Sequence, residues 1–151
     1  MRVSGKAAPL NRRMVLASAV VASGLIAWGA LSTVGHAGET LTPAQAHHKA
    51  LAGEILLIDV RRPDEWAKTG SGQGAVRLDL RRADFIETLD HLTQGDRTRA
   101  VAVICARGVR SQQTRKRLRG AGFVNAIDIP EGMLGSGAGP GWLHRGLPVT
   151  R

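Results

Sequence analysis

The chain holds a single cysteine, Cys105, and the residues around it are of types that stabilise a sulfur anion. Cys105 ends an apolar run, and Gly108 and Arg110 follow it just before a basic, helix-like segment. A loop that enters a helix presents backbone N–H groups without intrahelical acceptors, and the helix dipole adds partial positive charge there. Arg107 and Arg110 would add full charges. The pattern therefore predicts a cradle for a thiolate, or for a persulfide, an anion one atom longer.

Each residue of this segment has an expected part in the cradle. Gly108 would let the chain curve tightly and bring its amides close to a ligand, and Ser111 would cap the following helix through its hydroxyl. A lone cysteine at the end of a buried strand is otherwise a small apolar filler. A filler needs neither the glycine nor the arginine at these offsets, so their presence favours chemistry. The candidate substrate-binding loop comprises Ala106, Arg107, Gly108, Val109 and Arg110.

A single cysteine also excludes several kinds of site. No disulfide can form within the chain, and neither a C-x-x-C redox pair nor a zinc site with several cysteines is possible. His47 and His48 are adjacent, and neighbours on a helix point about 100° apart, so they do not easily share one ion. We interpret them as part of a solvated helix face, and we predict no metal site.

The charge of the chain is unevenly distributed. The formal net charge is +9 over 151 residues, but residues 1–37 hold four basic residues and no acidic one. The remaining residues carry 17 basic and 12 acidic side chains, which is moderately basic. Such a surface attracts anions. Tyrosine is absent and phenylalanine occurs twice, so base stacking has little support, and we do not expect nucleic-acid binding.

The first 37 residues have the pattern of an export signal. A basic start leads into an apolar stretch from Met14 to Leu31, and small residues follow, with a candidate cleavage site after Ala37. Arg12-Arg13 before the apolar stretch partly resembles a twin-arginine signal. The alternative is an uncleaved anchor, because the stretch reaches the lower limit of length for a helix that spans a membrane. We expect the rest of the chain to be periplasmic or, with an anchor, to face the periplasm.

The remaining chain alternates short apolar runs with segments of helical spacing. Buried strands are predicted at residues 54–60, 99–106 and 124–130, with a shorter strand near 76–78. Helices are predicted at residues 42–53, from Pro63, at 82–93 and at 111–122. Residues 69–75 form a glycine-rich turn, and the tail is loop-rich with Trp142 and Leu143 as core anchors.

This alternation predicts an α/β domain with a mainly parallel central sheet and helices on both faces. Parallel strands need crossover connections, and the crossovers supply the covering helices. Binding sites in such sheets form beyond the carboxyl ends of the strands. Cys105 lies at such an end.

The segment Cys105-Ala-Arg-Gly108-Val-Arg110-Ser111 resembles the active-site loop of rhodanese-like sulfurtransferases, whose pattern is C-x-x-G-x-R. Asp59-Val60-Arg61, followed by an acid and an aromatic residue, resembles the first signature of that family. The glycine-rich turn and the closing segments EGMLGS and GWLHRGLPV continue the resemblance in the family's order. The resemblance covers residues 40–150 and implies the three-layer fold of the family for that domain.

The resemblance also implies an activity. Cys105 would attack a sulfane donor such as thiosulfate, hold the outer sulfur as a persulfide and pass it to a thiophilic or thiol acceptor. The loop amides and Arg110 would hold the anion, and Arg107 would help to recruit the donor. Asp59 and Arg61 would brace the end of the sheet by pairing. Neither a metal nor an organic cofactor is implied, and a protein partner is compatible with this chemistry.

Two other functions remain open. Phosphatases and arsenate reductases of this fold use a longer C-x5-R loop, whereas four residues separate Cys105 from Arg110 here. The shorter loop favours sulfur over a tetrahedral oxyanion. The second alternative is a rhodanese-fold module that binds a partner or carries a persulfide without turnover.

Overall fold

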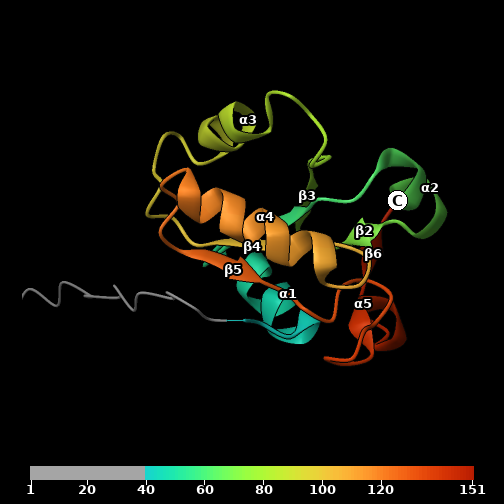
Figure 1. Ribbon diagram of the computed structural model, residues 1–151. Coiled ribbons are helices and arrows are strands. Elements are labelled where there is room, and N and C mark those ends of the chain that lie inside the picture. Colours follow the sequence, from blue (N-terminus) through green and yellow to red (C-terminus); the bar gives the residue numbers. More distant parts are fainter. Residues whose placement is uncertain (1–39) are drawn as a thin grey trace, which may run out of the picture. The chain divides into compact units, whose positions relative to one another are not determined.

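The computed structural model describes residues 40–151, so the predicted export signal at residues 1–37 lies outside the described residues. Helices and short strands alternate along the described part (Figure 1). In chain order they are α1 (Pro43–Leu51), β1 (Leu56–Asp59), α2 (Pro63–Thr69), β2 (Ser71–Gly72), β3 (Ala75–Arg77), α3 (Phe85–Leu92), β4 (Val101–Ile104), α4 (Val109–Gly120), β5 (Ala126–Asp128), α5 (Gly141–His144) and β6 (Val149–Thr150). No helix within residues 40–151 combines the length and the apolar character needed to cross a membrane.

The central sheet has the strand order β3-β1-β4-β5, and every pair of neighbours in it is parallel. The predicted α/β fold with a mainly parallel sheet is therefore confirmed. Ile58 of β1 lies opposite Val103 of β4, and Val103 lies opposite Asp128 of β5. This register aligns the carboxyl ends of the central strands, where β4 runs into Cys105.

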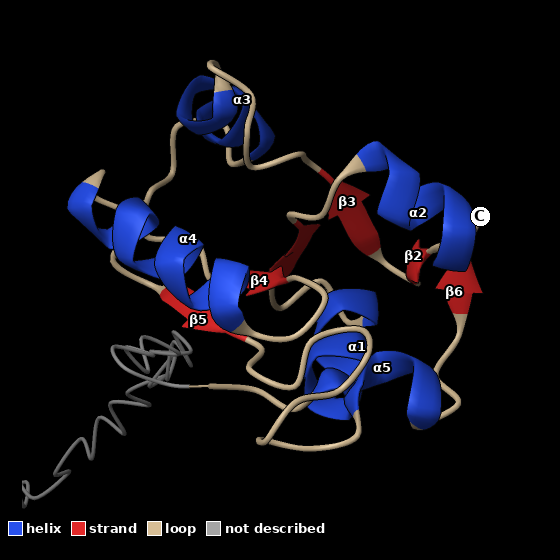
Figure 2. Cartoon of the chain, turned by 45° about the vertical axis from the view of Figure 1, so that its right-hand side comes forward, coloured by secondary structure: helices blue, strands red, loops and turns tan. Residues whose placement is uncertain are grey.

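The sheet is covered on both faces, as the alternation of elements predicted (Figure 2). One apolar cluster joins alternate residues of β1 and β4 to Phe85 and Leu89 of α3 and Leu118 of α4. The other cluster joins the intervening strand residues to Ala46 of α1 and Trp142 of α5. Successive strand side chains point to opposite faces, so continuous apolar strands supply both clusters.

Local signals in the sequence account for the helix ends. Thr42 accepts a hydrogen bond from the backbone N–H of Gln45, and the Gln45 side chain accepts one from the backbone N–H of Thr42. Pro43 occupies the first helical position, where its missing N–H is of no consequence. These reciprocal bonds satisfy two otherwise unpaired donors and fix the predicted start of α1.

A small second sheet was not predicted. Strands β2 and β6 pair antiparallel where the sequence indicated only a glycine-rich turn and a loop-rich tail. A Cβ atom at Gly72 would lie 2.6 Å from the Trp142 ring, so glycine is required for this close approach. Trp142 is fully buried, as predicted for a core anchor, and Leu143 is partly buried against the same cluster.

Candidate functional site

Cys105 directly follows β4, and helix α4 begins four residues later at Val109. The cap of the helix is Gly108, whose φ of 87° lies in the left-handed region that glycine adopts without strain. The expectation that Ser111 would be the cap is therefore wrong, because the turn at Gly108 starts the helix earlier than the sequence indicated. Ser111 lies inside the first turn, where its hydroxyl donates to the Gly108 carbonyl at 2.9 Å.

The thiol of Cys105 is held between two polar groups of this turn. The backbone N–H of Gly108 donates to the sulfur at 3.2 Å, and the thiol lies 3.5 Å from the Ser111 hydroxyl oxygen. Cys105 is only 1% exposed. The Gly108 contact places a polar hydrogen where a negative charge on sulfur would need it, whereas the thiol itself is the donor to Ser111.

Further backbone donors are available in the same turn. The backbone amides of Val109, Arg110 and Ser111 belong to the first turn of α4, so no residue within the helix can accept a hydrogen bond from them. No residue of the described chain accepts a backbone hydrogen bond from them or from the amide of Arg107. The loop therefore retains unpaired backbone N–H groups, which an anion cradle would require.

The segment that follows β5 supports the loop through main-chain contacts. Met133 donates its backbone N–H to the Cys105 carbonyl at 2.8 Å, and Leu134 donates to the Ala106 carbonyl at 2.9 Å. A Cβ atom at Gly132 would lie 2.5 Å from the same Ala106 oxygen, so backbone packs directly on backbone here. These contacts fix the path of the loop independently of its side chains.

The side chain of Arg110 is held in an ion pair with another residue. Its guanidinium makes two hydrogen bonds of 2.7 Å to the carboxylate of Glu65 in α2. The guanidinium holds the pKa of Glu65 down at about 2, from an ordinary value of 4.5, and the carboxylate raises the pKa of Arg110. The sequence predicted a helix from Pro63 but did not indicate this pair. The partners are 45 residues apart, and no local signal links them.

Replacing Glu65 with glutamine is expected to destabilise the fold by about 1–2 kcal/mol at neutral pH. The folded-state pKa of Glu65 lies below its ordinary value, so the carboxylate stabilises the fold above pH 4.5. That contribution is lost as the pH falls toward 2. Urea unfolding of both proteins across this range measures the effect. A difference that stays constant down to the acid end would contradict the prediction.

The control for this experiment is Glu87→Gln in α3. The Glu87 side chain is 77% exposed, and the change is expected to shift the unfolding free energy by less than about 0.5 kcal/mol at every pH.

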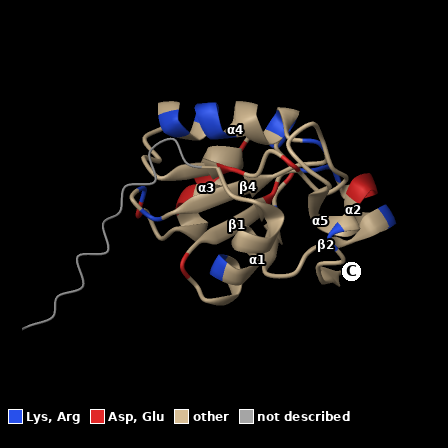
Figure 3. Ribbon diagram, turned by 90° about the horizontal axis from the view of Figure 1, so that it is seen from below, with Lys and Arg blue, Asp and Glu red and all other residues tan. Residues whose placement is uncertain are grey.

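Arg107 differs from Arg110 in being exposed, and no residue of the described chain forms an ion pair or hydrogen bond with it. The lysines and arginines of α4 continue from the loop as repeated bands along the helix (Figure 3). Residues 105–127 contain no acidic residue. A positive surface therefore extends from the mouth of the loop along α4.

Asp59 and Arg61, the predicted supporting residues, form a buried ion pair at the end of β1. Their closest atoms are 2.7 Å apart, and the two side chains are 0% and 1% exposed. Ser71 donates to the Asp59 carboxylate at 2.7 Å, and Arg61 donates to the Gly70 carbonyl at 2.6 Å. The pair thus binds the glycine-rich turn to the end of the sheet and does not contact the sulfur.

The same pair geometry occurs a second time at the surface. Asp79 and Arg81 repeat the spacing of Asp59 and Arg61, with two guanidinium nitrogens on one carboxylate. The Arg81 side chain is 62% exposed, however. Comparing the two pairs therefore distinguishes the effect of burial on stability from the effect of hydrogen-bond geometry.

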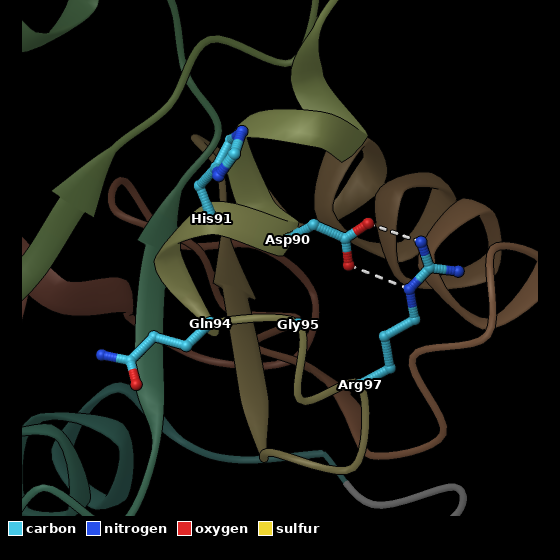
Figure 4. Close-up of a pocket in the computed structure, with 5 residues that line it drawn as sticks. All are labelled: Asp90, His91, Gln94, Gly95 and Arg97. Carbon is cyan, nitrogen blue, oxygen red and sulfur yellow. Dashed lines mark hydrogen bonds and ion pairs between the residues drawn. The ribbon is translucent and has the colours of Figure 1, made fainter.

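A surface depression at the end of α3 is lined by Asp90, His91, Gln94, Gly95 and Arg97 (Figure 4). Asp90 and Arg97 bind each other, and His91 and Gln94 point away from that pair. Arg97 also donates to the Ala121 carbonyl at 2.6 Å, which joins α3 to the end of α4.

His47 of α1 contacts Gln73 at 3.1 Å and lies edge-on to Trp142 of α5. The interpretation of a solvated face is therefore wrong for His47, which packs against α5, while His48 is exposed. Residues 40–151 contain no group of three or more His, Cys, Asp or Glu side chains arranged to bind a metal ion.

A protein-family model described as the rhodanese-like domain matches residues 42–135 of this chain. The chain belongs to the rhodanese family. Comparison with curated proteins gives no match.

Solved structures resemble this rhodanese domain over most of its length. The polysulfide-sulfur transferase homodimer from Wolinella succinogenes is 29% identical, with a TM-score of 0.56, over 74% of this chain and 77% of that chain. A Rhodopseudomonas palustris protein described as a possible tyrosine phosphatase is 26% identical, with a TM-score of 0.56, over 74% and 84% of the two chains. The rhodanese-like domain of an Anabaena protein, 20% identical with a TM-score of 0.54 over 74% and 77% of the chains, shares the fold.

Proposed function

We propose that this rhodanese domain is a sulfurtransferase that moves a sulfane sulfur from an anionic donor, such as thiosulfate, to a thiophilic or thiol acceptor. The observation that carries the proposal is the position of the Cys105 sulfur, 3.2 Å from the Gly108 amide in a turn with further unpaired amides. Family membership and the sulfur-transferring relative from W. succinogenes support the reaction class.

The reaction follows from this geometry in two displacements. The Cys105 thiolate attacks the outer sulfur of thiosulfate, a new S–S bond forms, and sulfite leaves with the electron pair of the broken bond. The outer sulfur of the resulting persulfide carries the negative charge, which the loop amides stabilise. An acceptor nucleophile then attacks that outer sulfur, and Cys105 leaves as the thiolate. No electrons are gained or lost overall.

The donor is expected to be an anion because the charges around the loop favour one. Glu65 neutralises Arg110, so Arg110 mainly fixes the loop against α2, and the exposed Arg107 supplies the free charge at the mouth. A surface depression of about 310 Å³ shares Arg110 with the loop and is lined by Val60, Arg62, Asp79, Leu80, Arg81 and Arg110. It provides space for a small donor or acceptor beside the loop.

Loop size argues against phosphatase chemistry, which the R. palustris relative raises as a possibility. Four residues separate Cys105 from Arg110, and the Gly108 amide already contacts the sulfur. A ring of amides this small suits a single sulfur atom better than a tetrahedral oxyanion.

Intact mass measured before and after incubation with thiosulfate tests the proposal. The protein should gain one sulfur atom, roughly 32 Da, as the persulfide, and cyanide should remove it. Cys105→Ser should gain nothing and should show no transfer, while its thermal unfolding stays close to that of the wild type. Transfer by Cys105→Ser would refute the assignment. A wild-type protein that gains no mass from thiosulfate or polysulfide would instead be the binding module.

We also propose that the domain acts in the periplasm. The basic, apolar and small residues in the order found at positions 1–37 support export. An uncleaved segment would hold the domain at the membrane, facing the same compartment.

A further inference from the structure

One buried carboxyl group has no part in the chemistry described so far. Asp128 is the last residue of β5 and is only 3% exposed. Its Oδ1 atom is buried and has no hydrogen-bond partner among the described residues. An unpaired buried carboxylate oxygen destabilises a fold unless the group is neutral or serves another purpose.

The sheet places Asp128 on the same face as Cys105. Val101, Val103 and Cys105 alternate into the cluster beneath α3 and α4, and Ala126 of β5 belongs to the same cluster. Strand side chains alternate with a period of two, so Asp128 points toward α4 as Ala126 does. The first turns of α4 cover this face with the buried residues Ser111 and Thr114.

Ser111 connects Asp128 to the sulfur. Its hydroxyl oxygen lies 3.5 Å from the Cys105 thiol, and the influence of the same side chain lowers the pKa of Asp128. In the structure the hydroxyl donates to the Gly108 carbonyl at 2.9 Å. The hydroxyl has one proton and three candidate acceptors: the Gly108 carbonyl, the Asp128 carboxylate and an anionic Cys105 sulfur. The charge of Asp128 therefore affects which of them receives it.

The charged groups around this pair are few. Burial is the largest influence on Asp128 and raises its pKa, while Ser111, the charge of Arg115 in α4 and the amide of Ile129 oppose it. No described cation donates a hydrogen bond to Asp128, because the Arg115 guanidinium donates to the Ala126 carbonyl instead.

On the side of the sulfur, the positive charge of Arg110 interacts with Cys105, and Arg110 is itself bound to Glu65 of α2. Asp59 at the end of β1 also acts on Arg110 and is itself paired with Arg61. Asp128 is therefore the buried acid on this face without an ion-pair partner in the described chain.

We propose that Asp128 is a positioning residue that acts through Ser111 to set the protonation of the Cys105 sulfur. A neutral Asp128 donates to the Ser111 oxygen, and Ser111 in turn donates its proton to the sulfur anion. An ionised Asp128 takes the Ser111 proton, and its negative charge opposes a thiolate nearby. The proposal deepens the proposed function, because it names a residue that controls the reacting sulfur.

The pH dependence of thiolate formation tests this coupling. The chain has one cysteine and no tyrosine, so the rise in ultraviolet absorbance on forming a thiolate reports on Cys105 alone. Cys105→Ser supplies the baseline. Asp128→Asn keeps the shape of the side chain, cannot become negative and can donate to Ser111. It is expected to lower the midpoint by roughly one pH unit, about a tenfold change in the thiolate-to-thiol ratio.

Ser111→Ala provides a second, independent variant. It removes the hydroxyl through which Asp128 is proposed to act on the sulfur. In the Ser111→Ala background, Asp128→Asn should shift the midpoint by less than roughly a third of its effect in the wild type. Asp84→Asn, which removes an exposed carboxylate bound to Arg82 beside α3, is the matched control and should leave the midpoint unchanged.

Two results would overturn the proposal. One is an unchanged midpoint in a folded Asp128→Asn protein. The other is an equal shift with and without the Ser111 hydroxyl, which would show that Asp128 does not act through it. The absorbance readout requires no sulfur donor, so failure of the protein to accept sulfur from thiosulfate would leave this test intact and the two proposals distinguishable.

Discussion

Gly108→Ala is expected to lose sulfur transfer almost completely and to destabilise the fold by about 2–4 kcal/mol. Gly108 has a φ of 87°, and a Cβ atom there would lie 2.2 Å from the carbonyl oxygen of Pro130. That oxygen belongs to the backbone and cannot move without displacing the supporting segment. The Gly108 amide would then leave its position 3.2 Å from the sulfur. A misplacement of about 1 Å at a reacting centre lowers the rate of reaction by roughly a hundredfold.

Gly120→Ala is the matched control for this substitution. Gly120 ends the same helix, has no left-handed backbone and would place its Cβ in open space. Alanine there should stabilise the fold by up to about 1 kcal/mol and leave transfer unchanged. The measurements are the transfer rate and urea unfolding of both variants. A Gly108→Ala protein with wild-type transfer would refute the importance of the amide–sulfur contact.

Asp59→Asn is expected to destabilise the protein by about 3–5 kcal/mol, because it leaves the buried Arg61 guanidinium without its hydrogen-bonded counter-charge. Arg61 is 1% exposed and its other partners, Thr69 and the Gly70 carbonyl, are neutral. Ser71 would also lose its charged acceptor. The free energy of unfolding in urea measures this effect.

Asp79→Asn tests whether burial is the cause. Asp79 and Arg81 make hydrogen bonds in the same pattern as Asp59 and Arg61, but solvent reaches the arginine. Exposed pairs contribute about 0–1 kcal/mol, so this variant should unfold nearly as the wild type does. Equal losses in the two variants would mean that bond geometry, and not burial, sets the energy.

The central elements of the fold could be predicted because each satisfies a local rule. The strands β1, β4 and β5 are apolar runs bounded by polar residues, and α3 carries its apolar residues at helical spacing. Their alternation then implies the parallel sheet. The two-residue strands β2 and β6 had no such signal, because their pairing depends on Gly72 fitting against Trp142, far along the chain.

The part of the candidate site that is contiguous in the sequence could also be predicted. Cys105, Gly108 and the turn into α4 are contiguous in sequence, so their proximity follows from the chain itself. The partner of Arg110 was missed because Glu65 reaches it only after α2 packs against the loop. Asp128 was missed for a similar reason, since an acid at the end of an apolar strand resembles the start of a surface loop. Its burial depends on the helix that covers it.

The main-chain contacts around Cys105 bear on how such a site can diversify. Pro130, Gly132 and Met133 meet the cysteine loop through backbone atoms, so the cradle depends on chain path and on two glycines. Arg107 and Val109, by contrast, are exposed, and Val109 is 65% exposed. Evolution can therefore replace these exposed residues, and so change which donor or acceptor is recognised, while the backbone around Cys105 stays the same. Libraries aimed at altered specificity belong at these two positions.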